Sequence, residues 1–283
     1  MRIPFVKMHG CGNDYIYIDC RERALADPPA LARRLSDRHF GVGGDGIILI
    51  LPSEQADYRM RMFNADGSEA EMCGNGIRCF AKWLYDRGLV EGDEARIETG
   101  AGIRTVRIYA EGGKARRVRV NMGAPRLDRA QIPMQGPPGQ AVNDELTIDV
   151  PGQGTHAFHF TAVSMGNPHC IIYVADTDSY PVTVHGPLIE RHPLFPKRVN
   201  VEFVQVLSAG EAKMRVWERG SGETLACGTG ASATCVAGVL NKKTDRRLLL
   251  HLLGGDLELE WADDGSVYLI GPAEEVFEGV VEA

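Results

Sequence analysis

Residues Met72–Cys79 read MCGNGIRC, and the same signature returns at Ala226–Ala233 as ACGTGASA. In both copies a cysteine, Cys73 or Cys227, comes directly before a Gly-X-Gly triplet. The apolar pattern that follows each triplet has helical spacing, so we expect each cysteine at the N-terminus of a helix. The unpaired N–H groups and partial positive charge of a helix N-terminus favour a thiolate and can also hold a carboxylate.

The repeat extends beyond the two cysteines. When Cys73 is placed on Cys227, an offset of 154 residues (227 − 73), six of the twenty positions from 57 to 76 are identical. At the same offset Gly12-Asn13 falls on Gly166-Asn167. Chance similarity between Gly-rich turns is the alternative, but an ungapped match at separate places favours two similar halves that face each other with one cysteine each.

The composition predicts a globular chain of two domains, because 283 residues, 44% of them hydrophobic, can build two cores. The net charge of -7 argues against a nucleic-acid partner. The N-terminal MRIPFVKMHG lacks an apolar targeting region and the longest apolar runs are strand-sized, so we expect a cytoplasmic protein without membrane segments. Seven cysteines without a CxxC pair predict reduced thiols, five of them small core or near-site residues: Cys11, Cys20, Cys79, Cys170 and Cys235.

The first half is predicted to be a mostly antiparallel sheet around the Cys73 helix. A Gly- and Asx-rich turn displays Asn13 between two extended runs, and Asn64 stands at the turn after the strand 58–63. Asp27-Pro28 begins a helix that we expect to stop at Gly41.

The stretch Gly41–Gly46, GVGGDG, formally matches the G-x-G-x-x-G motif. A dinucleotide-binding loop must follow a strand and open a helix. Here the stretch follows the predicted helix and opens the strand Ile47–Leu51, so we reject a dinucleotide site.

The second half repeats the plan, with Asn167 in the turn SMGNPH, a short helix near Leu188–Arg191, and Asn200 opening a strand before the Cys227 helix. The Gly- and Pro-rich stretch 121–139 is interpreted as the crossover between the halves. We therefore predict one domain at 1–123, completed by a return strand at 273–283, and a second domain at 124–272.

Two like thiols on facing helix ends suit the inversion of one carbon that carries a proton. A thiolate on one face removes the proton, and a thiol on the other face supplies its replacement. The backbone N–H groups of Gly74-Asn75 and Gly228-Thr229 can bind the α-carboxylate and stabilise the charge that develops there.

Five motifs carry a resemblance to a known family: HGCGNDY, FNADGSEAEMCGNGIRC, VSMGNPHC, RVN and ERGSGETLACGTGASA. In order and spacing, over essentially the whole chain, they resemble the diaminopimelate epimerases. The resemblance implies an α+β fold of two pseudo-symmetric domains, each a mostly antiparallel sheet wrapped around a central helix, with the active site in the cleft between them. It also implies a homodimeric isomerase that interconverts LL- and meso-diaminopimelate for lysine and peptidoglycan precursors, without pyridoxal phosphate or a metal.

Residue by residue, the resemblance makes Cys73 and Cys227 the acid/base pair, and His169 and Glu218 the groups that tune the two thiols. Arg219 would bind the distal carboxylate of the substrate. Gly46 departs from members that have a substrate-contacting Gln there, so that side-chain contact is expected to be absent. The implied substrate contacts are Asn13, Asn64, Gly74, Asn75, Asn167, Asn200, Glu218, Arg219, Gly228 and Thr229.

Several alternatives stay open at this point. The same fold serves isomerases of the proline or hydroxyproline racemase type. A dithiol redox protein or a catalytically silent amino-acid-binding protein would use the same cysteines differently. The three turn asparagines could serve the backbone alone, His169 could be a structural histidine, and Arg219 could form a surface ion pair.

Overall fold

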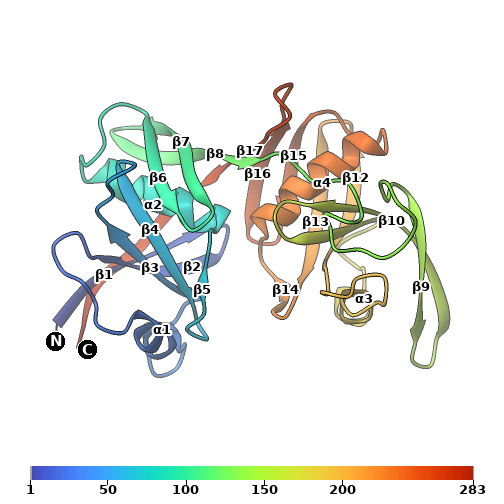
Figure 1. Ribbon diagram of the computed structural model, residues 1–283, viewed down its shortest axis with the longest axis horizontal. Helices are drawn as coiled ribbons and strands as arrows, with labels where there is room; N and C mark the ends of the chain where they lie inside the picture. Colours follow the sequence, from blue (N-terminus) through green and yellow to red (C-terminus); the bar gives the residue numbers. More distant parts are fainter. Residues whose placement is uncertain (1, 283) are drawn as a thin grey trace. The chain divides into compact units, whose positions relative to one another are not determined.

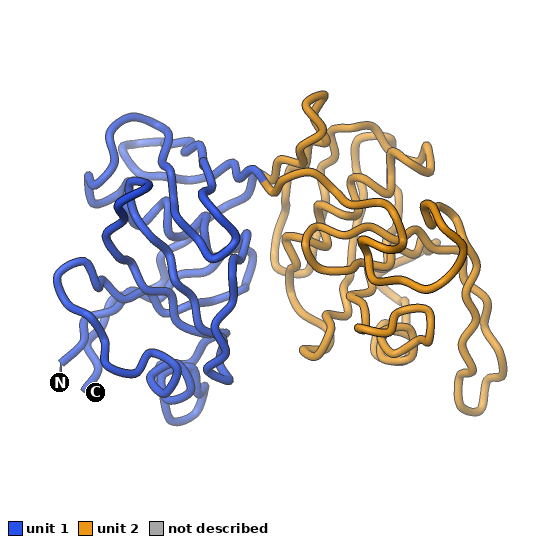
Figure 2. Tube along the Cα trace, viewed as in Figure 1, with its two compact units in different colours: residues 1–121, 270–283 blue, residues 122–269 orange. Residues whose placement is uncertain are grey.

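The protein, seen in a computed structural model that describes residues 2–282, divides into two compact units (Figure 2). Unit 1 joins Met1–Asn121 to Ile270–Ala283, and unit 2 is Met122–Leu269. Each unit is mixed α/β (Figure 1), and the strands β8 (Lys114–Gly123) and β17 (Val267–Pro272) carry the chain across the two limits.

Unit 1 is a mostly antiparallel sheet, as predicted. The order of pairing is β18-β1-β2-β3-β4-β6-β7-β8, with parallel pairs only at β2–β3 and β4–β6 among these strands. A short β5 pairs with β4. The further elements of this unit are β1 (Arg2–Gly10), β2 (Asn13–Asp19), α1 (Pro28–Ser36), β3 (Gly46–Leu51), β4 (Tyr58–Asn64), β5 (Glu69–Ala70), α2 (Gly74–Asp86), β6 (Glu94–Thr99), β7 (Gly102–Glu111) and β18 (Glu274–Glu282).

Unit 2 repeats this design. Its strands pair in the order β9-β10-β11-β12-β13-β15-β16, with parallel pairs at β11–β12 and β13–β15, and β14 closes a hairpin with β13. Its elements are β9 (Asp144–Val150), β10 (Gly154–Ser164), β11 (Pro168–Tyr173), α3 (Val182–Glu190), β12 (Asn200–Ser208), β13 (Glu211–Glu218), β14 (Gly222–Thr224), α4 (Gly228–Leu240), β15 (Arg247–Leu252) and β16 (Gly255–Trp261).

The central helices α2 and α4 are enclosed by their own sheets. Every residue from Gly74 to Leu84 of α2 is buried, and α4 is buried from Gly230 to Gly238. The buried part of α4 consists of small or apolar residues, GASATCVAG, whereas the buried Arg78 and Lys82 of α2 are satisfied by hydrogen bonds. This burial holds the N-terminus of each helix in place within its own unit.

Two predicted helices have different limits. Helix α1 begins as expected, since the Asp27 side chain accepts the Ala30 N–H at 3.0 Å, but it ends at Ser36 rather than Gly41. The Asp37 carboxylate instead accepts the N–H groups of His39 and Phe40 and starts a turn. Helix α3 is longer and earlier than the predicted 188–191, and it includes Gly186 and Pro187, residues that usually break a helix.

The packing of α3 against β13 requires glycine at position 186. A Cβ atom at this position would lie 2.6 Å from the Trp217 side chain, so only glycine allows the helix to pack on β13.

The stretch 121–139, which we predicted as the crossover, is more ordered than a linker. Arg126 forms a β-bridge with Ser164, and Ile132 is buried in the core of unit 2.

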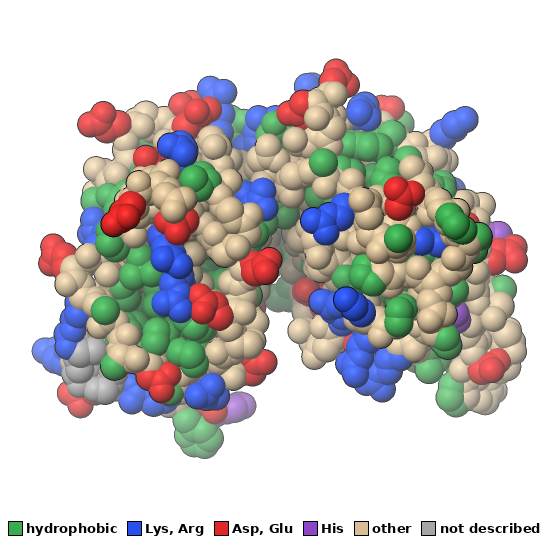
Figure 3. Space-filling view, viewed as in Figure 1, with side chains coloured by type: hydrophobic (Ala, Val, Ile, Leu, Met, Phe, Trp, Pro, Cys, Tyr) green, Lys and Arg blue, Asp and Glu red, His purple; other side chains and the backbone are tan. Residues whose placement is uncertain are grey.

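Acidic and basic side chains are interspersed on the viewed face of each unit (Figure 3). Ion pairs of the protein include Arg61–Glu69 and Arg215–Glu223. Within residues 2–282, no helix has the length and apolar character needed to cross a membrane.

Candidate active site

Cys73 is the N-cap residue of α2, which confirms the predicted position. Its backbone is extended (φ -134°, ψ 122°), and its Sγ accepts the Gly76 N–H at 3.4 Å. The Cys73 thiol also donates to Oδ1 of Asn13 at 3.3 Å. Because the N–H groups of Gly74 and Asn75 begin the helix, they have no acceptor within it and remain available to an anion.

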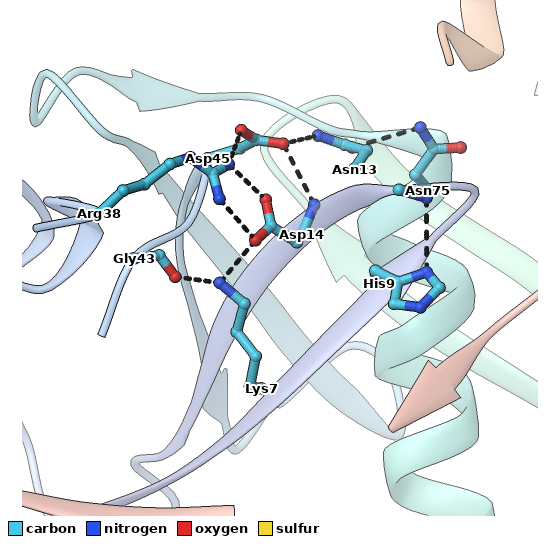
Figure 4. Close-up of polar contacts among 9 residues, drawn as sticks. Lys7, His9, Asn13, Asp14, Arg38, Gly43, Asp45 and Asn75 are labelled. Atoms are coloured by element: carbon cyan, nitrogen blue, oxygen red, sulfur yellow. Dashed lines mark hydrogen bonds and ion pairs between the residues drawn. The ribbon is translucent and has the colours of Figure 1, made fainter. Parts of the chain in front are cut away.

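Asn13 reaches Cys73 because of the turn between β1 and β2. Cys11 and Gly12 adopt positive φ angles of 53° and 81°, which turn the chain so that Asn13 begins β2 beside the α2 N-terminus. The Asn13 Nδ2 donates to Asp45 at 2.7 Å, and its Oδ1 accepts Asn75 Nδ2 at 3.2 Å. Figure 4 shows the Asn13 side chain between Asp45 and Asn75.

Tyr15 also lies beside Cys73, two residues after Asn13 and therefore on the same face of β2. Burial raises the pKa of Tyr15 well above its usual range, and the neighbouring Cys73 raises it further. The tyrosine therefore stays protonated beside the thiol.

Asn64 and Gly46 face each other across β3 and β4. The Asn64 Nδ2 donates to Ser68 Oγ at 3.0 Å. A Cβ atom at Gly46 would lie 2.1 Å from the Phe63 carbonyl oxygen, so this backbone has no room for any side chain.

Cys227 is the N-cap residue of α4 and repeats the geometry of Cys73. Its Sγ accepts the Gly230 N–H at 3.4 Å and lies 3.4 Å from Thr229 Oγ1, while the residue is only 5% exposed. We expected the helix end to favour the thiolate. Burial instead raises the pKa of Cys227 well above its usual range, and the carboxylates of Glu218 and Glu202 raise it further, so that expectation was wrong for this thiol.

His169 lies in a buried chain of polar contacts. Its Nδ1 is 2.7 Å from Glu202 Oε1 and its Nε2 is 3.0 Å from Asn167 Oδ1, and both His169 and Glu202 are fully buried. Asn167 Nδ2 donates to Thr229 Oγ1 at 3.2 Å, which links this chain to Cys227. Asn167 is therefore more than a turn residue, because its side chain links His169 to the Thr229 hydroxyl beside Cys227.

Glu218 approaches Cys227 from the end of β13. Burial raises the pKa of Glu218, and Thr224 Oγ1 donates to its Oε1 at 2.5 Å. A protonated Glu218 carboxyl would repel a Cys227 thiolate less than an ionised one would.

Asn200 and Arg219 are joined by a backbone contact. The Asn200 Nδ2 donates to the Pro168 carbonyl at 2.9 Å, and its Oδ1 accepts the Arg219 N–H at 2.9 Å. The exposed Arg219 guanidinium donates to the Lys197 carbonyl at 3.1 Å. Both polar atoms of the Asn200 amide therefore bind backbone groups of unit 2, and the bond to the Arg219 N–H fixes the start of the turn at Arg219.

The predicted residues form one group in each unit. In unit 1, Cys73, Gly74, Asn75 and Asn13 are in contact, and Asn64 lies on the neighbouring strand β4. In unit 2, the group consists of Cys227, Gly228, Thr229, Asn167, His169 and Glu218, with Asn200 and Arg219 next to it.

Three residues of these groups were missed by sequence reasoning: Asp45, Tyr15 and Glu202. Glu202 did leave a signal, because it is a lone carboxylate in the apolar strand sequence VEFV. Asp45 lies inside the glycine-rich stretch Gly41–Gly46, where no local pattern indicates a contact with Asn13.

The family profile described as Diaminopimelate epimerase matches residues 5–127 and 161–276. The chain belongs to the diaminopimelate epimerase family. It is 57% identical over 277 residues to the diaminopimelate epimerase of Pelotomaculum thermopropionicum, covering 97% of each chain, and 56% identical over 277 residues to that of Moorella thermoacetica, covering 97% of this chain and 98% of the other.

Membership of the diaminopimelate epimerase family confirms the resemblance drawn from the motifs and makes the protein an isomerase. Solved structures extend the comparison to the fold. A phenazine biosynthesis protein of the PhzF family from Bacillus anthracis matches with a TM-score of 0.70 at 20% identity, covering 100% of both chains. A probable proline racemase from Agrobacterium radiobacter matches with a TM-score of 0.68 at 17% identity, covering 99% of this chain and 92% of the other. These distant likenesses confirm the two-domain α/β fold and carry nothing about substrate.

Proposed function

We propose that this protein interconverts LL- and meso-diaminopimelate, in the biosynthesis of lysine and peptidoglycan precursors. The observation that carries the proposal is the pair of N-cap cysteines, Cys73 and Cys227, on two equivalent helices whose first N–H groups have no acceptor within the helix. The names of the most similar relatives support this substrate over a cyclic amino acid.

The proposed reaction moves one proton off and one proton onto the same α-carbon. The thiolate of one cysteine takes the proton as the C–H electron pair moves into the α-carboxylate, and the thiol of the other cysteine gives a proton to the opposite face. The carbon is inverted, the two sulfurs exchange protonation states, and no oxidant is consumed. This step requires both thiols to reach one carbon.

The two helix N-termini supply the electrostatic part of the proposed catalysis. The N–H groups of Gly74-Asn75 and Gly228-Thr229 would donate to the α-carboxylate, whose negative charge grows as the proton leaves. Donors fixed by buried helices need little reorganisation, so we propose that the reaction proceeds without pyridoxal phosphate or a metal.

The remaining residues fit the roles of thiol tuning and substrate binding. We propose that Glu218 and the His169 chain adjust the protonation of Cys227. The exposed Arg219 guanidinium suits bidentate binding of the distal carboxylate. Asn13, Asn64, Asn167 and Asn200 would orient the polar groups of the substrate, directly or through the turns they fix. We further propose a cytoplasmic homodimer.

The test is incubation with LL-diaminopimelate in deuterated water, followed by mass spectrometry and chiral separation. We expect deuterium at the α-carbon together with the meso product, in buffer free of pyridoxal phosphate and metal. L-proline and trans-4-hydroxy-L-proline serve as parallel substrates. Exchange on proline alone would favour the racemase type, and binding without exchange would favour a silent binding protein.

A further inference from the structure

The turn that carries Arg219 is held through its three backbone N–H groups. It joins β13 to β14, and Gly220 adopts a positive φ of 81° within it. The Arg219 N–H donates to Asn200 Oδ1 at 2.9 Å, and the Ser221 N–H donates to the carbonyl three residues before it at 3.1 Å. The Gly220 N–H donates to Oε1 of Glu190 at 3.1 Å. One of the three partners is therefore a carboxylate from α3.

Glu190 is the last residue of α3 and is only 2% exposed. Its Oε2 accepts the indole N–H of Trp217 at 2.8 Å, while its Oε1 accepts the Gly220 N–H and lies 3.5 Å from Arg198 Nη1. Gly186 lies four residues before Glu190 and thus on the same face of α3, where its lack of a side chain makes room for the Trp217 ring. The carboxylate reaches the turn because α3 packs closely on β13.

Glu190 also holds the segment that the Arg219 guanidinium contacts. That guanidinium donates to the Lys197 carbonyl at 3.1 Å. The two residues after Lys197 are both attached to Glu190, Arg198 by its ion pair and Val199 by its N–H, which donates to the Glu190 carbonyl at 3.2 Å. The backbone next to Arg219 and the segment against its guanidinium are therefore tied to one residue.

A carboxylate at position 190 can satisfy donors on both of its oxygens. An amide has one oxygen and one NH2 group, so glutamine here would turn its NH2 group toward either the Trp217 N–H or the Gly220 N–H. Whichever donor faced the NH2 group would lose its acceptor. Because a buried donor without a partner is costly, we expect the turn to move in such a variant.

We propose that Glu190 is a positioning residue for substrate binding, which holds the Arg219 turn in the conformation that receives the distal carboxylate of the substrate. The proposal rests on the proposed function, in which Arg219 binds that carboxylate. Glu218, the neighbour of Arg219, has supports of its own in the Thr224 hydroxyl and the pairing of β13 with β14. Glu190 should therefore act on KM and leave kcat nearly unchanged.

Steady-state kinetics of Glu190→Gln with LL-diaminopimelate test this division. We expect KM to rise roughly three- to tenfold, the range that one hydrogen bond can account for, with little change in kcat. Glu223→Gln is the matched control, because it converts a carboxylate of the same hairpin that pairs outside the turn, with Arg215, and its KM should stay at the wild-type value. A fall in kcat at an unchanged KM, or an equal rise of KM in the control, would overturn the proposal.

A double-mutant cycle with Arg219→Lys asks whether Glu190 acts through Arg219. Once the planar fork is lost, its placement matters less, so Glu190→Gln should raise KM by a smaller factor in the Arg219→Lys protein than in the wild type. Additive effects would show that Glu190 acts by another route and would overturn the proposal.

Glu190→Asp keeps the test decisive even where Glu190→Gln does not fold. The charge stays, but a side chain shorter by one methylene cannot reach both the Trp217 N–H and the Gly220 N–H, so KM should rise here too. An unchanged KM in Glu190→Asp would mean that the placement of the carboxylate is immaterial, and the proposal would fail.

Hydrogen exchange at residues 219–221, followed by mass spectrometry, separates this proposal from the proposed function. We expect the turn to exchange roughly three- to tenfold faster in Glu190→Gln and at the wild-type rate in Glu223→Gln. A wild-type protein that does not turn over diaminopimelate would refute the proposed function. An unchanged exchange rate in Glu190→Gln would refute the role of Glu190, whether or not epimerisation is observed.

Discussion

The two cysteines differ although their positions in the helices are the same. Cys73 is partly exposed and donates to a neutral amide, whereas Cys227 is buried and faces Glu218 and Glu202. The two copies of the sequence repeat therefore place their thiols in different electrostatic surroundings. An epimerase needs one thiol and one thiolate at any moment, so an asymmetric pair suits the proposed reaction.

Removing either thiol tests the two-base scheme. We expect Cys73→Ala and Cys227→Ala each to lower the rate of epimerisation by at least about a thousandfold, because each direction needs both proton-transfer groups. Deuterium incorporation and the circular dichroism melt are the measurements. Cys235→Ala is the control, since Cys235 is a buried thiol farther along α4, and it should retain activity. Normal turnover in either Cys73→Ala or Cys227→Ala would rule out the two-base scheme.

Arg219 is expected to act on binding rather than on proton transfer. Arg219→Lys keeps the positive charge but loses the planar fork, so we expect KM to rise about tenfold with little change in kcat. Steady-state kinetics with LL-diaminopimelate give both constants. Lys197→Ala is a useful comparison, because it alters the neighbouring side chain while the carbonyl that Arg219 contacts stays in place. An unchanged KM in Arg219→Lys would remove Arg219 from the site.

At the scale of elements, the strand β3 depends on glycine where it begins. A methyl group at Gly46 would press on the Phe63 carbonyl of β4, so we expect Gly46→Ala to lower the free energy of unfolding by about 1–3 kcal/mol. Chemical denaturation measures the change. The control is Gly210→Ala, where the Cβ atom meets nothing within 4 Å, and an equal loss in both variants would contradict the steric cause.

Sequence reasoning located elements well where the local chemistry was strong. The Cys-Gly-X-Gly repeats predicted both N-caps, and Asp27-Pro28 predicted the start of α1. It failed at α3, because the fit between Gly186 and Trp217 is a tertiary contact that no local pattern carries. Asp45 and Glu202 were missed for the same reason, since each acts through a partner that is distant in sequence.

At the scale of the whole molecule, the buried thiols make stability depend on alkaline pH. Burial raises the pKa of Cys20 to about 11 and those of Cys79 and Cys235 to about 12. An unfolded cysteine ionises near pH 8.5, so above this pH the unfolded state loses protons that the folded state keeps. The stabilising contribution is complete below about pH 8.5 and is lost as the pH rises toward the folded values.

We therefore expect the free energy of unfolding to fall between about pH 8.5 and 11, by about 1.4 kcal/mol per pH unit for each such thiol. Urea titrations under reducing conditions at several pH values measure the slope. Cys235→Ala should make the slope shallower by the contribution of one thiol, about 1.4 kcal/mol per pH unit. A stability that stays constant over this range in the wild-type protein would show that these thiols ionise alike in both states.

Strand β18 has a consequence for how the chain is made. It pairs with β1 from Arg2↔Glu282 to His9↔Glu274, so the neighbour of β1 on one side is synthesised only after the whole of unit 2. A chain that ends before β18 contains all of unit 2, while β1 still has an open edge, which is a site for wrong pairing and aggregation. On a released chain truncated before β18, limited proteolysis should find unit 2 protected and β1 accessible. The later half of this protein would then mature first.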